Sequence, residues 1–157
     1  MDEKSETPGE IQTPYGKPFA DYDMRAMMYH SGHGALLKQQ FHALGENWVE
    51  LALPWNAAIA IDAETGVLAS GPVISLLDNA TGMAAWQRRG MVLHQVTVDL
   101  RLDYLRAPTP GRMLIGRGEC HGISGELSFV RGVAYEDSLD DPVARATGTY
   151  MLIGEPS

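Results

Sequence analysis

The chain contains 157 residues, a length typical of one domain with an additional terminal segment. Hydrophobic residues make up 45% and charged residues 20%, and the single cysteine excludes an internal disulfide framework. The net charge of −8 argues against nucleic acid or an anionic membrane surface as a partner, because both attract clustered positive charge. No apolar run is long enough to span a bilayer and the acidic first residues do not resemble a secretory signal, so we expect a cytoplasmic protein.

The N-terminal region divides into a tail and the beginning of a domain. Residues 1–18 combine charge with several prolines and glycines, which predicts a disordered tail before a single domain over 19–157. From Tyr22 to Phe41 the pattern is mostly helical, and Gly32 and Gly34 should divide it into two short helices. The apolar positions expected to be buried there are Met24, Met27, Met28, Ala35, Leu36 and Leu37.

The clearest helix covers residues 71–87. Ser70 or Gly71 can cap it, Pro72 suits its first turn, and Gly90 should end it. Its apolar residues point nearly all the way round the helix axis, which predicts burial on most sides.

Most of the remaining chain is typical of strands. Apolar and polar residues alternate over 95–104, and Gly122–Gly125 indicates a hairpin. Strands are expected over residues 48–53, 95–104, 112–121, 127–136 and 143–153.

Small residues occupy alternate positions of the last three strands, on one face of each. They are Gly116, Gly118, Gly132, Ala134, Ala144, Ala146 and Gly148. Such positions allow another element to approach the backbone closely, and the only element apolar enough is the helix over 71–87. We therefore expect an α+β fold in which a five- to six-stranded antiparallel sheet wraps around this one long central helix. The alternative is that the small residues only relieve sheet twist.

One acidic residue stands out in the central helix. Asp78 lies among apolar residues, and its neighbours on the same helix face are small or polar: Ser75, Thr81 and Gly82. A buried carboxylate is costly unless it is paired or used, and these small residues leave room for a substrate beside it. The alternative is that this narrow stripe faces solvent.

Several segments resemble a known family. They are residues 66–71 (GVLASG), 76–80 (LLDNA), 97–100 (TVDL) and 104–108 (YLRAP), within a similarity over about 35–153. In these segments the chain resembles the PaaI-type acyl-CoA thioesterases of the hotdog fold. The resemblance implies a hotdog fold, an acyl-CoA thioester as substrate, sheets paired across a homodimer, and no metal or redox cofactor.

The resemblance also implies roles for individual residues. Asp78 corresponds to the catalytic carboxylate, acting as general base on water or as nucleophile, and Thr97 to the hydroxyl residue that positions water. The backbone N–H of Ser70 corresponds to the group that polarises the thioester carbonyl. Because Pro72 lacks an N–H, Ser70 and Gly71 must supply the donors at the helix start.

The spacing of these groups predicts a shared site. Ser70 and Asp78 are eight residues apart, which is about 12 Å along a helix, so one carbonyl group cannot contact both in one chain. We therefore expect a symmetric homodimer with two equivalent shared sites, and further association to a homotetramer is open. The coenzyme A phosphates need cationic partners, for which Arg88, Arg89, Arg106 and Arg112 are the expected residues, unless these are ordinary surface charges.

Two departures from the family pattern keep other functions open. The motif histidine falls at Ala69 and the upstream asparagine at Ala63. A second hypothesis is therefore a non-catalytic acyl or acyl-CoA binding protein. A third is an enoyl-CoA hydratase of the hotdog fold, but the histidine that this reaction pairs with the aspartate falls at Met83. His30 and His33 lack cysteine or acidic partners nearby, so no metal site is expected.

Overall fold

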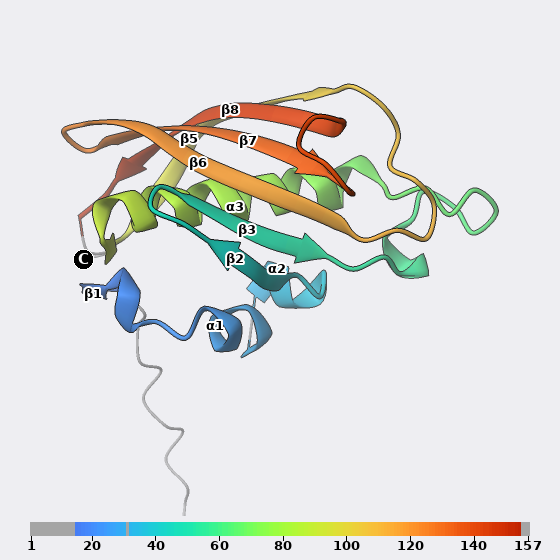
Figure 1. Ribbon diagram of the computed structural model, residues 1–157. Helices are drawn as coiled ribbons and strands as arrows, with labels where there is room; N and C mark the ends of the chain where they lie inside the picture. Colours follow the sequence, from blue (N-terminus) through green and yellow to red (C-terminus); the bar gives the residue numbers. More distant parts are fainter. Residues whose placement is uncertain (1–14, 31, 155–157) are drawn as a thin grey trace, which may run out of the picture.

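The computed structural model describes residues 15–30 and 32–154, and within them an antiparallel sheet curves around one long helix (Figure 1). The six strands of this sheet follow the spatial order β2-β3-β6-β7-β8-β5. They are β2 (Gln40–Leu44), β3 (Trp48–Leu53), β5 (Gln95–Tyr104), β6 (Leu114–Ser124), β7 (Leu127–Tyr135) and β8 (Pro142–Leu152). Every neighbouring pair is antiparallel, which confirms the expected α+β fold.

The long helix, α3 (Ser70–Arg89), lies on the inner face of the sheet (Figure 1). It ends at Gly90, where a φ of +73° suits glycine. Among the residues that the structure describes, no helix is both long and apolar enough to cross a membrane. Burial extends over most of the surface of α3, as expected, and includes Val73, Leu76, Leu77, Ala80, Thr81, Gly82, Met83, Ala84 and Ala85.

The cap of α3 differs from the expectation. The capping position is Ala69, whose side chain makes no hydrogen bond, rather than Ser70 or Gly71. The N–H of Ala69 donates to the carbonyl oxygen of Ile59 at 2.9 Å, and this backbone bridge keeps Ala69 extended. The bridge, rather than a capping side chain, therefore decides where the helix begins.

The small residues of the strands allow the sheet to approach α3. A Cβ atom added at Gly118 would overlap the backbone carbonyl of Ala80, and Gly116 and Gly132 face side chains of α3. The prediction of a cradle for the helix is therefore confirmed at these positions. It is wrong at Gly148, whose open side faces the backbone of the neighbouring strand β5, where that strand has a bulge.

The last four residues of the tail expected over 1–18 are part of the fold. Residues 1–14 lie outside the described part of the chain. The short strand β1 (Lys17–Pro18) pairs with β4 (Met91–Val92), and the Tyr15 ring stacks on His94 with centroids 3.7 Å apart. Backbone pairing and aromatic stacking, rather than a periodic apolar pattern, therefore attach residues 15–18 to the fold.

Two short helices precede the sheet, as predicted. They are α1 (Met24–His30) and α2 (Gly32–Leu36), and they lie beside β2 and α3 (Figure 1). Met24 and Met28 are buried as expected, whereas Leu36, the last residue of α2, is 80% exposed, so the expectation of its burial is wrong. The 3-10 helices are η1 (Phe19–Asp21) and η2 (Ala57–Ile59).

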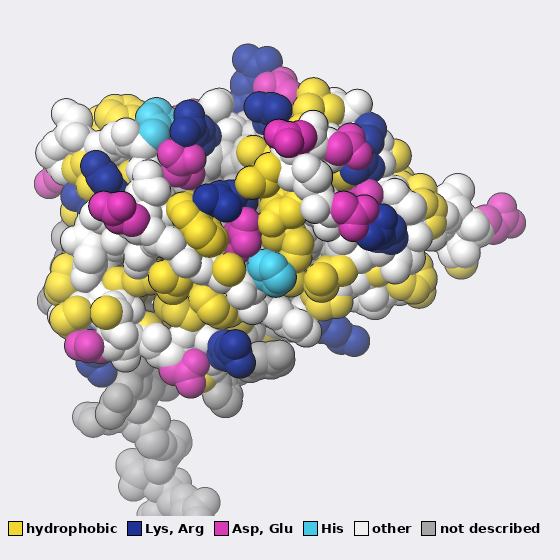
Figure 2. All heavy atoms as spheres, viewed as in Figure 1, with side chains coloured by type: hydrophobic (Ala, Val, Ile, Leu, Met, Phe, Trp, Pro, Cys, Tyr) yellow, Lys and Arg dark blue, Asp and Glu magenta, His cyan; other side chains and the backbone are white. Residues whose placement is uncertain are grey.

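Charges of both signs are mixed on the face of the molecule that Figure 2 shows. On the strands β6 and β7, Arg131 pairs with Glu119 at 2.9 Å. Arg117 pairs with the buried Glu50 of β3 at 3.2 Å. Neither sign of charge forms a continuous stripe on this face (Figure 2).

Candidate active site

Asp78, in the third turn of α3, is half-buried and lines a cavity of about 340 Å³. It is the only charged side chain among the described lining residues. Asp78 therefore lies at the wall of a cavity and is only partly exposed to solvent. The other lining residues come from α1, α2, α3, β5, β8 and the segment before β1: Tyr15, Met27, Met28, Gly34, Ala35, Asn79, Gly82, Met83, Trp86, Gln95, Thr97 and Tyr150.

Two hydroxyl groups donate to the same carboxylate oxygen of Asp78. The Thr97 hydroxyl lies 3.0 Å from Oδ1, so the structure brings together these two predicted site residues. The Tyr150 hydroxyl lies 2.7 Å from the same Oδ1. Sequence reasoning missed Tyr150, although it continues the inward-facing series of Ala144, Ala146 and Gly148 on the last strand.

The three neighbours of Asp78 on its helix face have different surroundings. Gly82 lines the cavity, and its carbonyl accepts a hydrogen bond from the Gln95 side chain at 2.8 Å. Thr81 is fully buried and does not line the cavity, because its hydroxyl turns back to the Leu77 carbonyl at 2.7 Å. Of the three residues expected to leave room for a substrate beside Asp78, only Gly82 lines the cavity.

Ser75, the third of these neighbours, lies one turn before Asp78 and outside the cavity. Its hydroxyl donates to the Gly71 carbonyl at 3.1 Å and lies 2.8 Å from Nε2 of His33. Although the two residues lie on the same side of α3, the rise and rotation over three residues give Ser75 neighbours that differ from those of Asp78. Ser75 thus joins α2 to the first turn of α3 and does not contact the space beside Asp78.

Methionines and a tryptophan form the apolar part of the cavity wall. Met27 and Met28 come from α1, and Met83 and Trp86 from α3. The Trp86 indole N–H donates to the Leu93 carbonyl at 2.8 Å, so its ring is fixed in place. The cavity therefore combines one carboxylate with a large apolar surface.

The start of α3 opens into a second hollow of about 610 Å³. Ala69 and Ser70 line it together with Tyr104, whose hydroxyl donates to the Ser70 carbonyl at 3.1 Å. The N–H groups of Ser70 and Gly71 have no partner inside the helix, because the first N–H groups of a helix never do. The first turn therefore offers donors and the positive end of the helix dipole to a group in this hollow.

The two halves of the predicted site do not meet within one chain. No residue lines both the cavity of Asp78 and the hollow of Ser70. Their separation along α3 is about 12 Å at the usual rise per residue. A single chain therefore presents the carboxylate and the helix-start donors as two separate sites.

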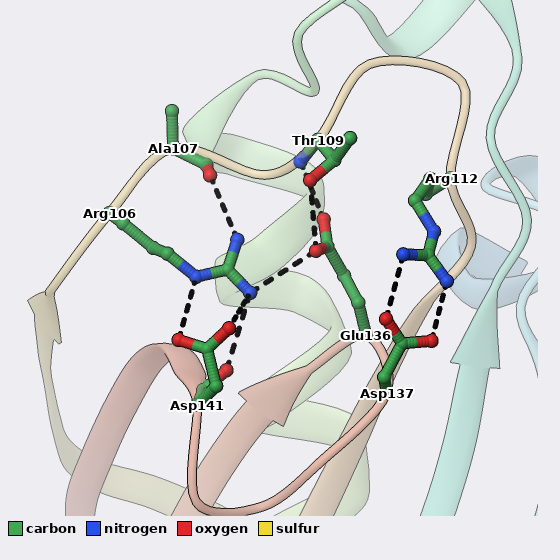
Figure 3. A network of polar contacts seen from close by, with 7 residues as sticks. All are labelled: Arg106, Ala107, Thr109, Arg112, Glu136, Asp137 and Asp141. Carbon is green, nitrogen blue, oxygen red and sulfur yellow. Dashed lines mark hydrogen bonds and ion pairs between the residues drawn. The ribbon is translucent and has the colours of Figure 1, made fainter.

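Two of the arginines expected to bind phosphates have partners within the fold. Figure 3 shows Arg106 between Glu136 and Asp141, with contacts of 3.1 Å and 3.2 Å. In the same figure Arg112 lies on Asp137. These pairs join the loop after β5 to the turn between β7 and β8, which indicates a structural role.

The remaining two arginines lie at the end of α3. Arg89 donates to the Ser128 hydroxyl at 2.9 Å and to the carbonyls of Gly125 and Leu127 at 3.1 Å, so it fixes the β6–β7 hairpin. Arg88 is exposed to solvent. The expectation of a phosphate contact therefore fits the surroundings of Arg88 better than those of Arg89.

Known proteins share this fold and part of this sequence. Residues 65–140 match the family model of the thioesterase superfamily. No curated protein sequence matches the chain. Among solved structures, a Pseudomonas aeruginosa protein is 30% identical, with a TM-score of 0.69 over 74% of this chain and 87% of that one.

Two further structures extend the comparison. A thioesterase family protein of Silicibacter pomeroyi is 25% identical, with a TM-score of 0.70 over 87% of this chain and 99% of that one. The Escherichia coli PaaI protein, from the phenylacetic acid degradation operon, is 18% identical, with a TM-score of 0.70 over 82% and 89%. The chain belongs to the thioesterase superfamily, and its fold is the hotdog fold of the PaaI-like proteins. This membership supports thioester hydrolysis as the general class of activity.

Proposed function

We propose that the protein hydrolyses an acyl-CoA thioester and that Asp78 is the catalytic carboxylate. The observation that carries this proposal is a carboxylate in a largely apolar cavity, held by two hydroxyl groups. Asp78 either removes a proton from the attacking water or attacks the carbonyl carbon itself. The C–S bond then breaks and coenzyme A leaves as its thiol. If Asp78 attacks the carbonyl carbon, water afterwards cleaves the anhydride formed on Asp78. Both routes release the free acid, with water as the only co-substrate.

The proposed site is shared between two copies of the chain, and β5 provides the geometry. Its beginning, with Gln95 and Thr97, lines the cavity of Asp78, while its end, with Tyr104, lines the hollow at the start of α3. Antiparallel pairing of β5 with the β5 of a second copy would place the beginning of one strand beside the end of the other. Two-fold symmetry would thereby create two sites, each with Asp78 from one copy and Ser70 from the second.

The exposure of β5 supports this pairing. Within the described residues β5 pairs with β8 alone, so its other edge has free backbone donors and acceptors. Val96 and Val98 on this strand are 39% and 55% exposed. A long edge strand with apolar side chains is a surface that proteins normally cover. A second copy covers it in the proposed homodimer, and association of dimers to a tetramer is compatible with the same sites.

The remaining parts of the substrate have proposed positions as well. The N–H groups of Ser70 and Gly71 stabilise the oxyanion that forms on the thioester carbonyl. The acyl group occupies the cavity beside Met27, Met83 and Trp86, and the exposed Arg88 is the proposed partner for coenzyme A phosphates.

Release of thiol from a panel of acyl-CoAs tests the proposal. Asp78→Asn and Asp78→Ala should lower kcat/KM by at least about a thousandfold, whereas Asp140→Asn, which removes an exposed carboxylate in a turn, should match the wild type. Tight acyl-CoA binding without turnover on any substrate would contradict hydrolysis and favour the binding protein. Equal rates for Asp78→Ala and wild type would remove Asp78 from the reaction.

A further inference from the structure

The hydroxyl of Tyr150 on β8 contacts both the side chain and the backbone carbonyl of Asp78. The Tyr150 ring is only 4% exposed, and its hydroxyl lies 2.7 Å from Oδ1 and 2.6 Å from the carbonyl oxygen of Asp78. The absence of a side chain at Gly82 provides the space for this ring, because a Cβ there would lie 3.2 Å from a ring carbon of Tyr150. The ring is therefore packed against α3 and places its hydroxyl beside Asp78.

A buried threonine lies beside this hydroxyl. The single hydroxyl proton of Thr81 can go to the Leu77 carbonyl at 2.7 Å or to the Tyr150 oxygen at 3.1 Å. A phenol carries one proton and donates to one oxygen at a time. Burial, together with the charge of Asp78, raises the pKa of Tyr150 well above its ordinary value, so the phenol keeps this proton.

The two carboxylate oxygens of Asp78 therefore differ. Oδ1 accepts hydrogen bonds from both Tyr150 and Thr97. Within the described part of the chain, no hydrogen bond reaches Oδ2. Two donors on one oxygen restrict the rotation of the carboxylate and leave the other oxygen for a water or a carbonyl carbon.

We propose that Tyr150 is a positioning residue for Asp78: its hydroxyl anchors Oδ1 and thereby presents Oδ2 to the substrate. This inference rests on the hydrolysis proposed above. The Asp78 carbonyl, 2.6 Å away, gives the same hydroxyl a second acceptor. When Asp78 gains a proton during the reaction, the Tyr150 O–H can turn to this carbonyl without movement of the ring.

The split between kcat and KM distinguishes positioning from a purely structural role. A hydroxyl that only orients the Asp78 carboxylate acts on the chemical step and leaves the apolar cavity wall unchanged, so its loss lowers kcat and not the affinity for substrate. A loss of packing at the cavity would change both kcat and KM.

Tyr150→Phe removes this hydroxyl and keeps the ring. We expect kcat to fall about 10- to 100-fold with KM within about twofold. Tyr135→Phe is the matched control, because the Tyr135 hydroxyl donates to the buried Glu50 at 2.9 Å on the outer side of the sheet. This control should keep the wild-type kcat and KM.

Thr81→Val gives a second test that does not alter the tyrosine. It removes the hydroxyl that lies 3.1 Å from that of Tyr150 and can donate to it, and should lower kcat about threefold with KM within about twofold. Wild-type kcat in Tyr150→Phe, or in Thr81→Val if the first variant does not fold, would overturn the positioning role. Activity of Asp78→Asn at the wild-type level would instead overturn the hydrolysis proposal itself.

Discussion

Thr97 and Tyr150 lie directly opposite each other in the β5–β8 ladder, and their hydroxyls converge on one oxygen of Asp78. Residues that face each other across two antiparallel strands present their side chains on the same side of the sheet. A register shift of one residue would send one of them to the other face. The pairing register of β5 and β8 therefore determines the surroundings of the proposed catalytic carboxylate.

Removal of the Thr97 hydroxyl should slow the reaction without loss of the fold. Thr97→Val deletes one of the two donors to Asp78, so we expect kcat/KM for thiol release to fall about tenfold. Thr97→Ser retains the hydroxyl and should keep most of the activity. A valine variant as fast as the wild type would show that this donor has no part in the reaction.

The helix-start donors can be tested one at a time. Ser70→Pro removes an N–H at the first position of α3, where proline is well tolerated, and Ala69 before it already has the extended backbone that proline requires. We expect kcat to fall about 100- to 1000-fold with an unchanged melting temperature, because one oxyanion donor is lost. Ser70→Ala, which keeps the N–H, is the matched control and should stay active.

Mixing two inactive variants tests whether the site is shared. A heterodimer of Asp78→Asn and Ser70→Pro has one site in which both changes meet and one site with neither. Refolding the two variants together should therefore restore thiol release to about a quarter of the wild-type rate, since half of the dimers are mixed and each has one intact site. Activity that stays at the level of the separate variants would place both groups of a site in the same chain.

The exposed edge of β5 should be essential for association. Val98→Lys places a charge from each copy at the proposed β5–β5 contact, where like charges are unfavourable. We expect light scattering to show a monomer at concentrations where the wild type is a dimer, with loss of activity in parallel. Leu139→Lys, at a site 39% exposed between β7 and β8, should leave both unchanged. A wild type that is monomeric at working concentration would contradict the shared site.

The close approach of the sheet to α3 should make Gly118 intolerant of any side chain. Gly118→Ala would place a methyl group against the rigid backbone of Ala80, so we expect the free energy of unfolding in urea to fall by about 3 kcal/mol. Gly122→Ala on the same strand, whose added Cβ would meet the Phe129 ring at 3.5 Å, should change it by less than about 1 kcal/mol. Equal losses in both variants would mean that helix packing is not the cause.

The Arg106–Glu136 pair should stabilise the fold in a pH-dependent manner. Burial opposes the charge of Glu136, but hydrogen bonds from Thr109 and Arg106 outweigh it and lower the pKa of Glu136 from its usual 4.5. The stabilisation is therefore present above about pH 4.5 and lost as the pH falls through the lower folded-state value.

Glu136→Gln tests this pH dependence by unfolding at several pH values. We expect the variant to lose about 1–3 kcal/mol at pH 7 and to show a smaller further decline in acid than the wild type. Glu46→Gln, at an exposed position, should behave like the wild type throughout. A variant whose acid decline parallels that of the wild type would assign the effect to other carboxylates.

The main elements of the fold could be predicted because their patterns are local. Period-two alternation placed β5 at its observed bounds, 95–104, and apolar residues on all sides of α3 indicated its burial. The ends were less predictable, since the backbone bridge to Ile59 rather than a capping side chain starts α3. The pairing of residues 17–18 with β4 also has no local signal, because it depends on a strand more than 70 residues away.

The candidate site was predictable to a similar extent. Asp78 could be identified from the sequence of the helix alone, because a carboxylate among buried apolar residues is costly. Its partner Tyr150 is 72 residues away, and only the alternation of the last strand indicates that it faces inward. The surroundings of Arg106 could not be predicted, because its partners Glu136 and Asp141 are brought to it by the turn after β7.

The three methionines of the cavity wall have a consequence for substrate selection. Met27 and Met28 come from α1 and Met83 from α3, so the wall consists of long unbranched thioether side chains from two separate elements. Such side chains change rotamer at little energetic cost and fill irregular spaces. Such a wall can adapt to acyl groups of different shape. We therefore expect the protein to accept a range of acyl groups of similar size rather than to discriminate strictly among them.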